Sequence, residues 1–235
     1  MTLVCAEAYR SAARSQAVAE PEPAPVAVPV APVEPPAPEM NPMEPMDEVA
    51  LVDDDIDFLL DAGWAERVGE NLGVWVAVER QRFYLIEGLR PVLEVACATA
   101  EAGSGAVADS LQTPLGWHAV AEKFGDDAKW GQVSPSRAMT EEIWQPGTHA
   151  GEDLVLTRLL WLTGLEPGKN QGTDAEGRSV DSKARFIYIH GTNEEERLGT
   201  PSSHGCIRIS NNDVIEVFDR VPVGTPVFIS ERATQ

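Results

Sequence analysis

The spacing of apolar side chains changes along the chain, and each spacing predicts a different kind of element. From Asp55 to Val68, apolar residues recur every three or four positions, which is the period of one face of a helix. Beyond Asn71 the period becomes two, and the alternating runs at 74–78 and 83–86 flank a short polar turn. The pattern predicts a short amphipathic helix that docks on the following domain, and then a β-hairpin.

Further short apolar runs are separated by clusters of Gly, Pro, Asn and Asp, which break regular structure. These runs predict strands at 92–98, 117–121, 154–162, 186–189, 206–209 and 227–230. One more helix is predicted, capped by Ser210, Asn211 or Asn212, with a buried stripe of Val214, Val217, Phe218 and Val221. We therefore expect a mostly β domain with a minor helical part, built as two packed sheets or as a partly closed barrel.

Composition divides the 235 residues into an extended tail and a folded part. Residues 18–46 contain ten of the 18 prolines in a background of Ala, Val and Glu, which favours polyproline II and offers little to pack. We expect a disordered Pro- and Ala-rich acidic tail and linker over 1–46. The short amphipathic helix then lies within 47–70, and one folded domain covers 71–232.

Charge and hydropathy exclude several classes of function. Eighteen basic and 38 acidic residues give a net charge of −20, which repels nucleic acid and anionic lipid surfaces. No apolar run approaches the roughly 18 residues that a membrane-spanning helix needs. Arg10 and Arg14 follow the first apolar stretch, whereas an export signal carries its basic residues in front. We expect a monomer with no nucleic acid partner, no membrane span and no recognisable export signal in this sequence.

Two histidines and one cysteine within 190–206 are the strongest candidates for chemistry. His190 ends one apolar strand and Cys206 begins another, so neighbouring strands would bring an imidazole and a thiol to the same rim. A nearby imidazole activates a cysteine by taking its proton. His204 lies two residues before Cys206, so both side chains point to one face of an extended strand. Gly205 between them lets a substrate approach backbone amides that could form an oxyanion hole.

These residues resemble the signature of the L,D-transpeptidases with a YkuD-type catalytic domain. That signature is a His-Gly pair, a gap, and then Ser/Thr-His-Gly-Cys followed by a hydrophobic residue and Asn or Arg. This chain has His190-Gly191 and then Ser203-His204-Gly205-Cys206-Ile207-Arg208. Similar segments flank the signature at 113–117, 157–162, 211–214 and 221–227, so the resemblance covers about Gly73 to Ser230.

The resemblance implies a catalytic role for five residues. Cys206 would be the nucleophile and His190 its general base, with the backbone carbonyl of Gly191 orienting the imidazole. His204 would shape the site, and the amides of Gly205 and Cys206 would hold the oxyanion.

Three residues are implied to bind the substrate: Ser203, Arg208 and Asn193. Arg208 stands where the strictest form of the signature has Asn. The structural alternative for Arg208 is a strand arginine that pairs with an acidic neighbour.

The resemblance also implies a fold and a reaction. The fold would be an L,D-transpeptidase-like β-sandwich of two packed mixed sheets with a minor helical part. Cys206 would attack peptidoglycan stem tetrapeptides and form a thioester. Resolution of the thioester would form 3-3 crosslinks or exchange the terminal D-amino acid. If water resolves the thioester, the same site is an L,D-carboxypeptidase. The partners would be peptidoglycan stem peptides in the periplasm or cell envelope, carbapenems would inhibit, and no cofactor is expected.

Two other classes of function stay open at this point. His190, His204 and Cys206 could bind zinc as an open catalytic site, although no acidic residue in the motif is placed to act as a base. The domain could also be an inactive wall-binding or partner-binding module whose proline-rich tail is the functional part. The presence of both the cysteine and the histidine disfavours this alternative.

The remaining candidates point to structural roles. His118 and His149 have no partner at useful spacing and are expected in the core or in solvent. Cys97 lies in an apolar strand and is expected to be buried. Cys5 is interpreted as an exposed thiol in the tail, and Asp53–Asp55 as a solvated helix entry, because no further oxygen ligands follow at the spacing of a metal loop.

Overall fold

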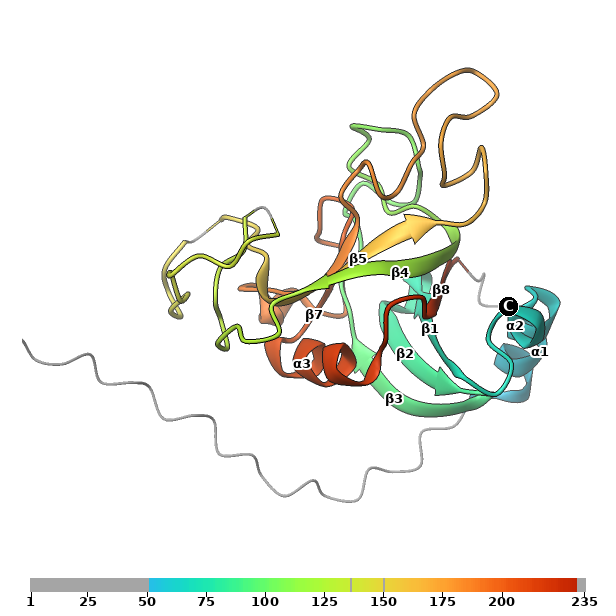
Figure 1. Ribbon diagram of the computed structural model, residues 1–235, viewed down its shortest axis with the longest axis horizontal. Coiled ribbons are helices and arrows are strands. Elements are labelled where there is room, and N and C mark those ends of the chain that lie inside the picture. Colours follow the sequence, from blue (N-terminus) through green and yellow to red (C-terminus); the bar gives the residue numbers. More distant parts are fainter. Residues whose placement is uncertain (1–50, 136, 150, 232–235) are drawn as a thin grey trace, which may run out of the picture. The chain divides into compact units, whose positions relative to one another are not determined.

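A computed structural model describes residues 51–135, 137–149 and 151–231. The predicted strands are present in it. The strands are β1 (Leu72–Ala77), β2 (Arg82–Glu87), β3 (Arg90–Ala96), β4 (Gly116–Phe124), β5 (Leu156–Gly164), β6 (Tyr188–Gly191), β7 (Ile207–Ile209) and β8 (Pro226–Ser230). They make one mixed sheet in the order β3-β2-β1-β8-β4-β5-β6-β7 (Figure 1). The predicted hairpin is β1 with β2. The expected tail over 1–46 lies outside the described residues, and so does Cys5.

The predicted mostly β fold with a minor helical part is confirmed. The strands do not divide into two separately bonded sheets, because β8 pairs with both β1 and β4 and joins the two halves. Register shifts in three antiparallel pairs bend the sheet, since an extra residue on one strand increases the local twist. Beyond β3, Ala98 exchanges backbone hydrogen bonds of 2.8 and 2.9 Å with Arg208 of β7. The sheet therefore curls into the partly closed barrel that the pattern also allowed.

One apolar core fills the inside of the curled sheet. Alternate strand residues point into it, and α3 (Asn211–Arg220) adds its apolar stripe, which includes Val214, Val217 and Phe218. Ser210 caps this helix, as predicted, because its side chain accepts a hydrogen bond of 3.0 Å from the backbone N–H of Asp213.

The N-terminal amphipathic segment forms α1 (Asp53–Asp61) and α2 (Trp64–Arg67), so the prediction of a single helix over 55–68 is wrong. Gly63 separates the two helices because its φ of 86° is left-handed, which a continuous right-handed helix excludes. Both helices pack on the outer face of the sheet in a second apolar cluster that contains Leu59, Trp64, Trp75, Tyr84, Trp117 and Phe228. They therefore dock on the following domain, as expected. Among the described residues, no helix is long and apolar enough to cross a membrane.

The expectation of a solvated helix entry is wrong for Asp55. Only 2% of Asp55 is exposed, and its two carboxylate oxygens accept hydrogen bonds of 2.8 Å from the guanidinium of Arg80. The guanidinium carbon of Arg80 also lies 5.7 Å from the ring centroid of Trp75. This ion pair ties α1 to the 3-10 helix η1 (Val78–Arg80), which forms the turn of the first hairpin.

We predict that Arg80→Met lowers the free energy of unfolding by about 3 kcal/mol, because it removes the cation that faces a buried carboxylate. Urea denaturation followed by tryptophan fluorescence measures the change. The matched control is Arg90→Met, which removes an exposed ion pair with Glu87 and should cost less than about 0.5 kcal/mol. Equal losses in the two variants would contradict the importance of burial for the pair between Asp55 and Arg80.

Candidate active site

Two neighbouring parallel strands bring the histidine and cysteine segments together. β6 pairs with β7 so that Ile189 lies opposite Ile207 and His190 lies opposite Arg208. Ile189 and Ile207 belong to the core, so alternation places His190 and Arg208 on the other face of the sheet. Cys206 immediately precedes β7 and shares that face with Arg208. The expected meeting of the two segments at one rim is therefore present.

Cys206 is half-buried beside an apolar cluster of β5 and β6, at the wall of a cavity of about 270 Å³. Its sulfur accepts a hydrogen bond of 3.4 Å from the backbone N–H of Tyr188 and donates one of 3.4 Å to the carbonyl of Phe186. Burial raises the pKa of the Cys206 thiol to about 11, although the Tyr188 N–H and the charges of Arg185 and Arg208 act in the opposite direction. The resting sulfur is therefore protonated at neutral pH and needs a base to become a nucleophile.

His190 has the tautomer and the protonation state of a base. Its Nδ1 donates a hydrogen bond of 2.8 Å to the carbonyl of Gly191, because that oxygen can only accept. Nε2 therefore carries the lone pair. Burial lowers the pKa of His190, so the imidazole is neutral at pH 7. In the described part of the chain, no hydrogen bond joins His190 to Cys206, so proton transfer between them requires one of the side chains to move.

A tight turn presents Cys206. The Ser203 hydroxyl donates a hydrogen bond of 2.7 Å to the carbonyl of Cys206 and accepts one of 3.2 Å from the N–H of Gly205. Gly205 has a φ of 127°, and a Cβ atom there would lie 3.3 Å from the carbonyl oxygen of Gln112. Thr113 fixes the other side of the turn by donating a hydrogen bond of 3.0 Å to the carbonyl of Gly205.

These contacts show what two of the expected site groups bind within the protein. Ser203 is only 2% exposed, so its hydroxyl closes the turn instead of facing a substrate. The N–H of Gly205 is already bonded to Ser203, so it is not available to an oxyanion in this arrangement. The reason is the short span of the turn, which brings the hydroxyl of its first residue against the backbone of its last two.

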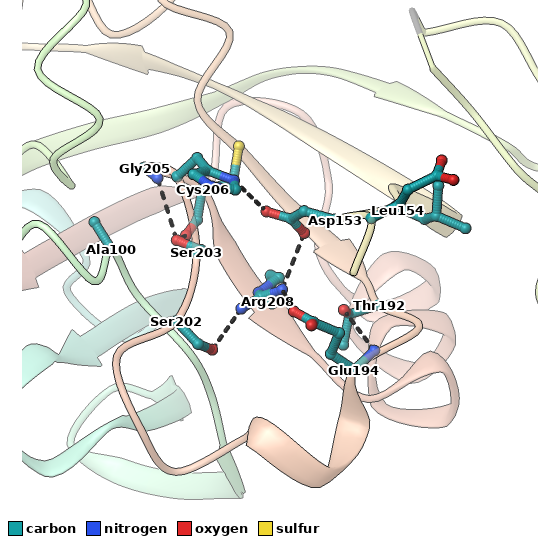
Figure 2. A network of polar contacts seen from close by, with 12 residues as sticks. Ala100, Asp153, Leu154, Thr192, Glu194, Ser202, Ser203, Gly205, Cys206 and Arg208 are labelled. Carbon is teal, nitrogen blue, oxygen red and sulfur yellow. Dashed lines mark hydrogen bonds and ion pairs between the residues drawn. The ribbon is translucent and has the colours of Figure 1, made fainter. Parts of the chain in front are cut away.

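Arg208 lies at the centre of a buried polar network, which Figure 2 shows from close by. Its side chain is 0% exposed and forms ion pairs of 3.0 Å with Asp153 and 2.7 Å with Glu194. It also donates a hydrogen bond to the hydroxyl of Ser202. Arg208 is therefore enclosed by protein groups, and its expected contact with the substrate stays a prediction. The structural alternative, a strand arginine paired with acidic neighbours, describes its observed surroundings.

Asp153 and Glu194 are the acidic residues of this network, and sequence reasoning missed both. Asp153 accepts one hydrogen bond of 3.0 Å from Arg208 and pairs at 3.0 Å with the exposed ring of His204. Its charge also acts on the pKa of both Cys206 and His190. Asp153 lies in the loop between β4 and β5, far from the signature in the sequence. No local pattern marks it, because only the folded loop brings it to the site.

Asn193 holds the segment around Asp153 in place. Its amide nitrogen donates a hydrogen bond of 2.8 Å to the carbonyl of Glu152, and its amide oxygen accepts one of 2.9 Å from the N–H of Leu154. Both polar groups of the Asn193 side chain are thus bonded to backbone on either side of Asp153. The expectation that Asn193 binds a substrate stays a prediction.

The weaker candidates have structural surroundings. His118 is fully buried and Cys97 is fully buried, as expected for core residues. His149 is not without partners, because its ring lies 2.7 Å from Glu142 and 3.4 Å from Glu152. Within the described residues, no group of three or more His, Cys, Asp and Glu side chains is arranged to hold a metal ion.

Comparison with known proteins assigns the part of the chain that forms the sheet to one family. A family model described as the L,D-transpeptidase catalytic domain matches residues 72–229. YqjB of Bacillus subtilis is 45% identical over 60 residues, which are 26% of this chain and 32% of that protein. YbiS of Escherichia coli is 50% identical over 48 residues, which are 20% of this chain and 16% of that protein. Both proteins carry the name L,D-transpeptidase, and the matched segments span about a third or less of their length.

Similar structures carry the same family name. An L,D-transpeptidase from Xylanimonas cellulosilytica aligns with 75% of this chain and 69% of its own chain, at 20% sequence identity and a TM-score of 0.40.

We predict that Asp153→Asn makes the Cys206 thiol more acidic. Loss of the carboxylate removes a charge that raises the thiol pKa, while the opposing charge of Arg208 remains. A fall of one unit from about 11 gives about a tenfold faster reaction with iodoacetamide at pH 8, because the thiolate is the reacting form. The rate is measured by mass spectrometry of the peptide that contains Cys206. Asp219→Asn, at an exposed position of α3, is the control and should leave the rate unchanged. An unchanged or slower rate in Asp153→Asn would contradict the assignment.

Proposed function

Because the chain belongs to the L,D-transpeptidase catalytic domain family, we propose that it is a cysteine-dependent L,D-transpeptidase that acts on peptidoglycan stem tetrapeptides. One observation supports this proposal above the others. Cys206 opens into a cavity on the same face of the sheet as a neutral histidine whose tautomer is fixed by the carbonyl of Gly191. A thiol and a neutral imidazole on neighbouring strands are the groups that nucleophilic acyl transfer needs.

The proposed reaction begins with proton transfer. His190 Nε2 takes the proton of Cys206 as the sulfur attacks the carbonyl carbon after the L-centre of the diamino acid. A carbon–sulfur bond forms, and collapse of the tetrahedral intermediate breaks the carbon–nitrogen bond to the terminal D-alanine. The imidazolium returns its proton to the leaving amine, and a thioester remains on Cys206. The pKa of about 11 supports this order, because the thiol stays protonated until the base acts.

The second half reaction consumes the thioester. An amine of a second stem peptide attacks the thioester carbonyl, gives its proton to His190 and forms a 3-3 crosslink, while the thiol is regenerated. A free D-amino acid in place of the second stem gives exchange of the terminal residue. Water in the same position gives the L,D-carboxypeptidase alternative. The same residues serve all three outcomes, so the acceptor decides the product.

We assign the stabilisation of the oxyanion to the backbone N–H of Cys206, because the N–H of Gly205 is engaged by Ser203. Ser203, Arg208 and Asn193 are proposed as positioning residues that hold the turn and the Asp153 segment. The side chain of His204 is 67% exposed and lines the cavity. We propose that His204 reaches the substrate from the cavity wall.

The family also supports a location and a division of the chain. Peptidoglycan lies outside the cytoplasmic membrane, so we propose that the protein works in the periplasm or cell envelope. We keep the proposal that 71–232 is the catalytic domain, that 47–70 docks on it, and that 1–46 is an acidic linker.

Purified protein is expected to release D-alanine from a disaccharide tetrapeptide and to form a crosslinked dimer, both measured by mass spectrometry. Cys206→Ala should abolish both products, and His190→Gln should lower the rate at least about 100-fold through loss of the general base. Cys97→Ala is the matched control and should keep most of the activity, because Cys97 is buried in the core. Undiminished turnover by Cys206→Ala would refute the mechanism. Release of D-alanine without a dimer would assign the carboxypeptidase alternative.

A carbapenem is expected to acylate Cys206 with an unusual dependence on pH. The β-lactam carbonyl presents the same acylation step as the peptide, and the adduct should add one drug mass that Cys206→Ala removes. Because burial lowers the pKa of His190, the base stays neutral below the ordinary histidine value of about 6.5. The acylation rate, followed by mass spectrometry, should therefore be kept as the pH falls from 8 to the ordinary histidine value of about 6.5 and should fall only at lower pH. A loss of rate centred at or above pH 6.5 would contradict a neutral buried base.

A further inference from the structure

The cavity in front of Cys206 contains a cation that the proposed mechanism does not use. Arg185 lies in the segment just before β6 and lines this cavity together with Cys206, His204, Phe186 and Asp109. Arg185 is also close to the turn that presents the sulfur. A Cβ atom built on Gly205 would lie 3.9 Å from one guanidinium nitrogen of Arg185.

Neutral groups hold the guanidinium of Arg185 in place. It donates hydrogen bonds of 3.1 Å to the carbonyl of Gly105, 2.7 Å to the carbonyl of Gln112 and 3.4 Å to the hydroxyl of Ser110. A guanidinium has five N–H groups, so two remain without a partner among the described residues. No ion pair of Arg185 occurs in the described part of the chain. The side chain is therefore fixed in orientation without a salt bridge to any described carboxylate, and Asp109 at the cavity edge acts on its charge only from a distance.

The charges around Arg185 are consistent with an anion site. Burial lowers the pKa of Arg185, while the nearby Cys206 and Asp109 oppose this shift, and an arginine stays protonated in either case. Asp109 is exposed at the cavity edge. The chain as a whole has a net charge of −20, so an anionic ligand is repelled from most of its surface. Arg185 has no salt bridge to a described carboxylate, so the cavity is a place where an anionic ligand meets a positive charge.

We infer that Arg185 binds a carboxylate next to Cys206 and that the site selects acyl donors with a free carboxylate on the residue that leaves. A guanidinium forms charge-assisted hydrogen bonds with a carboxylate, and the Nε–H and one Nη1–H of Arg185 stay available for such a bond. The cavity contains both the nucleophile and this cation, so a bound carboxylate lies beside the carbonyl that Cys206 attacks. The choice of donor rests on the proposed function, whereas the carboxylate site itself does not.

Arg185 also has a structural role, since it joins the 105–112 loop to the segment before β6. A substitution could therefore change the reactivity of Cys206 through the shape of the cavity alone. A ratio of two rates on the same protein separates the two effects. A distorted cavity changes the reaction of Cys206 with charged and neutral reagents together, whereas a lost carboxylate site changes only the reaction with the charged one.

The test compares iodoacetate with iodoacetamide, which differ only by a carboxylate in place of a carboxamide. Alkylation of the Cys206 peptide is followed by mass spectrometry on the full chain, and the iodoacetate rate is divided by the iodoacetamide rate. Both reagents need the thiolate, so the ratio does not depend on the thiol pKa. The same ratio for the chain unfolded in urea is the reference.

The folded wild type is expected to exceed the unfolded reference by about tenfold or more, as a charge-assisted hydrogen bond implies. Arg185→Gln should bring the ratio down to the reference, and Arg185→Lys should keep part of it. Lys183→Gln is the matched control, because it removes an equal charge two residues away where Lys183 pairs with Glu122 on the surface. A wild-type ratio at or below the reference, or a high ratio that survives Arg185→Gln, would overturn the inference.

A second arm tests the donor. Tetrapeptides that end in D-alanine or in D-alanine carboxamide are compared as substrates of the wild type and of Arg185→Gln. The wild type should prefer the free acid in kcat/KM, mainly through KM, and Arg185→Gln should lose that preference. Equal use of both peptides by the wild type would overturn the selection of donors. If neither peptide reacts while the alkylation ratio is high, the proposed function fails and the carboxylate site stands.

Discussion

The parallel pairing of β6 with β7 is the constraint on which the site depends. β7 has only three residues, and its register sets which face Cys206 and His190 occupy. A slip by one residue would turn His190 toward the core, because successive strand residues point to opposite faces. The backbone bonds between Ala98 and Arg208 hold β7 from its other side. The curl of the whole sheet therefore fixes the position of the cysteine.

The buried charge of Arg208 adds a second constraint of a different kind. A guanidinium without its carboxylates costs several kcal/mol in the interior, so Asp153, Glu194 and Ser202 have to be in place together. Asp153 comes from the connection between β4 and β5, whereas Glu194 and Ser202 come from the connection between β6 and β7. Arg208 thus couples the long loop between β4 and β5 to the strand that follows Cys206. The contacts of the signature arginine among the described residues are with these loops.

The spacing of apolar residues and the local motifs are sufficient to predict the helices and strands of this fold, because alternation and helix caps depend on neighbours in the sequence. The hairpin of β1 and β2, the Ser210 cap and the meeting of the His190 and Cys206 segments all follow from such patterns. The single continuous sheet does not, since it depends on the pairing of β8 with two distant strands. Asp153 and Arg185 could not be found either, because their proximity to Cys206 exists only after the loops have folded.

The resting site holds no charge on its two reacting groups, and this follows from where they lie. Burial favours a neutral thiol at Cys206 and a neutral imidazole at His190. The free protein therefore does not bear the free-energy cost of burying an ion at either side chain. The charge of Arg185 favours the thiolate. His190 would therefore take the proton from a thiol whose pKa lies below the value that burial alone would give.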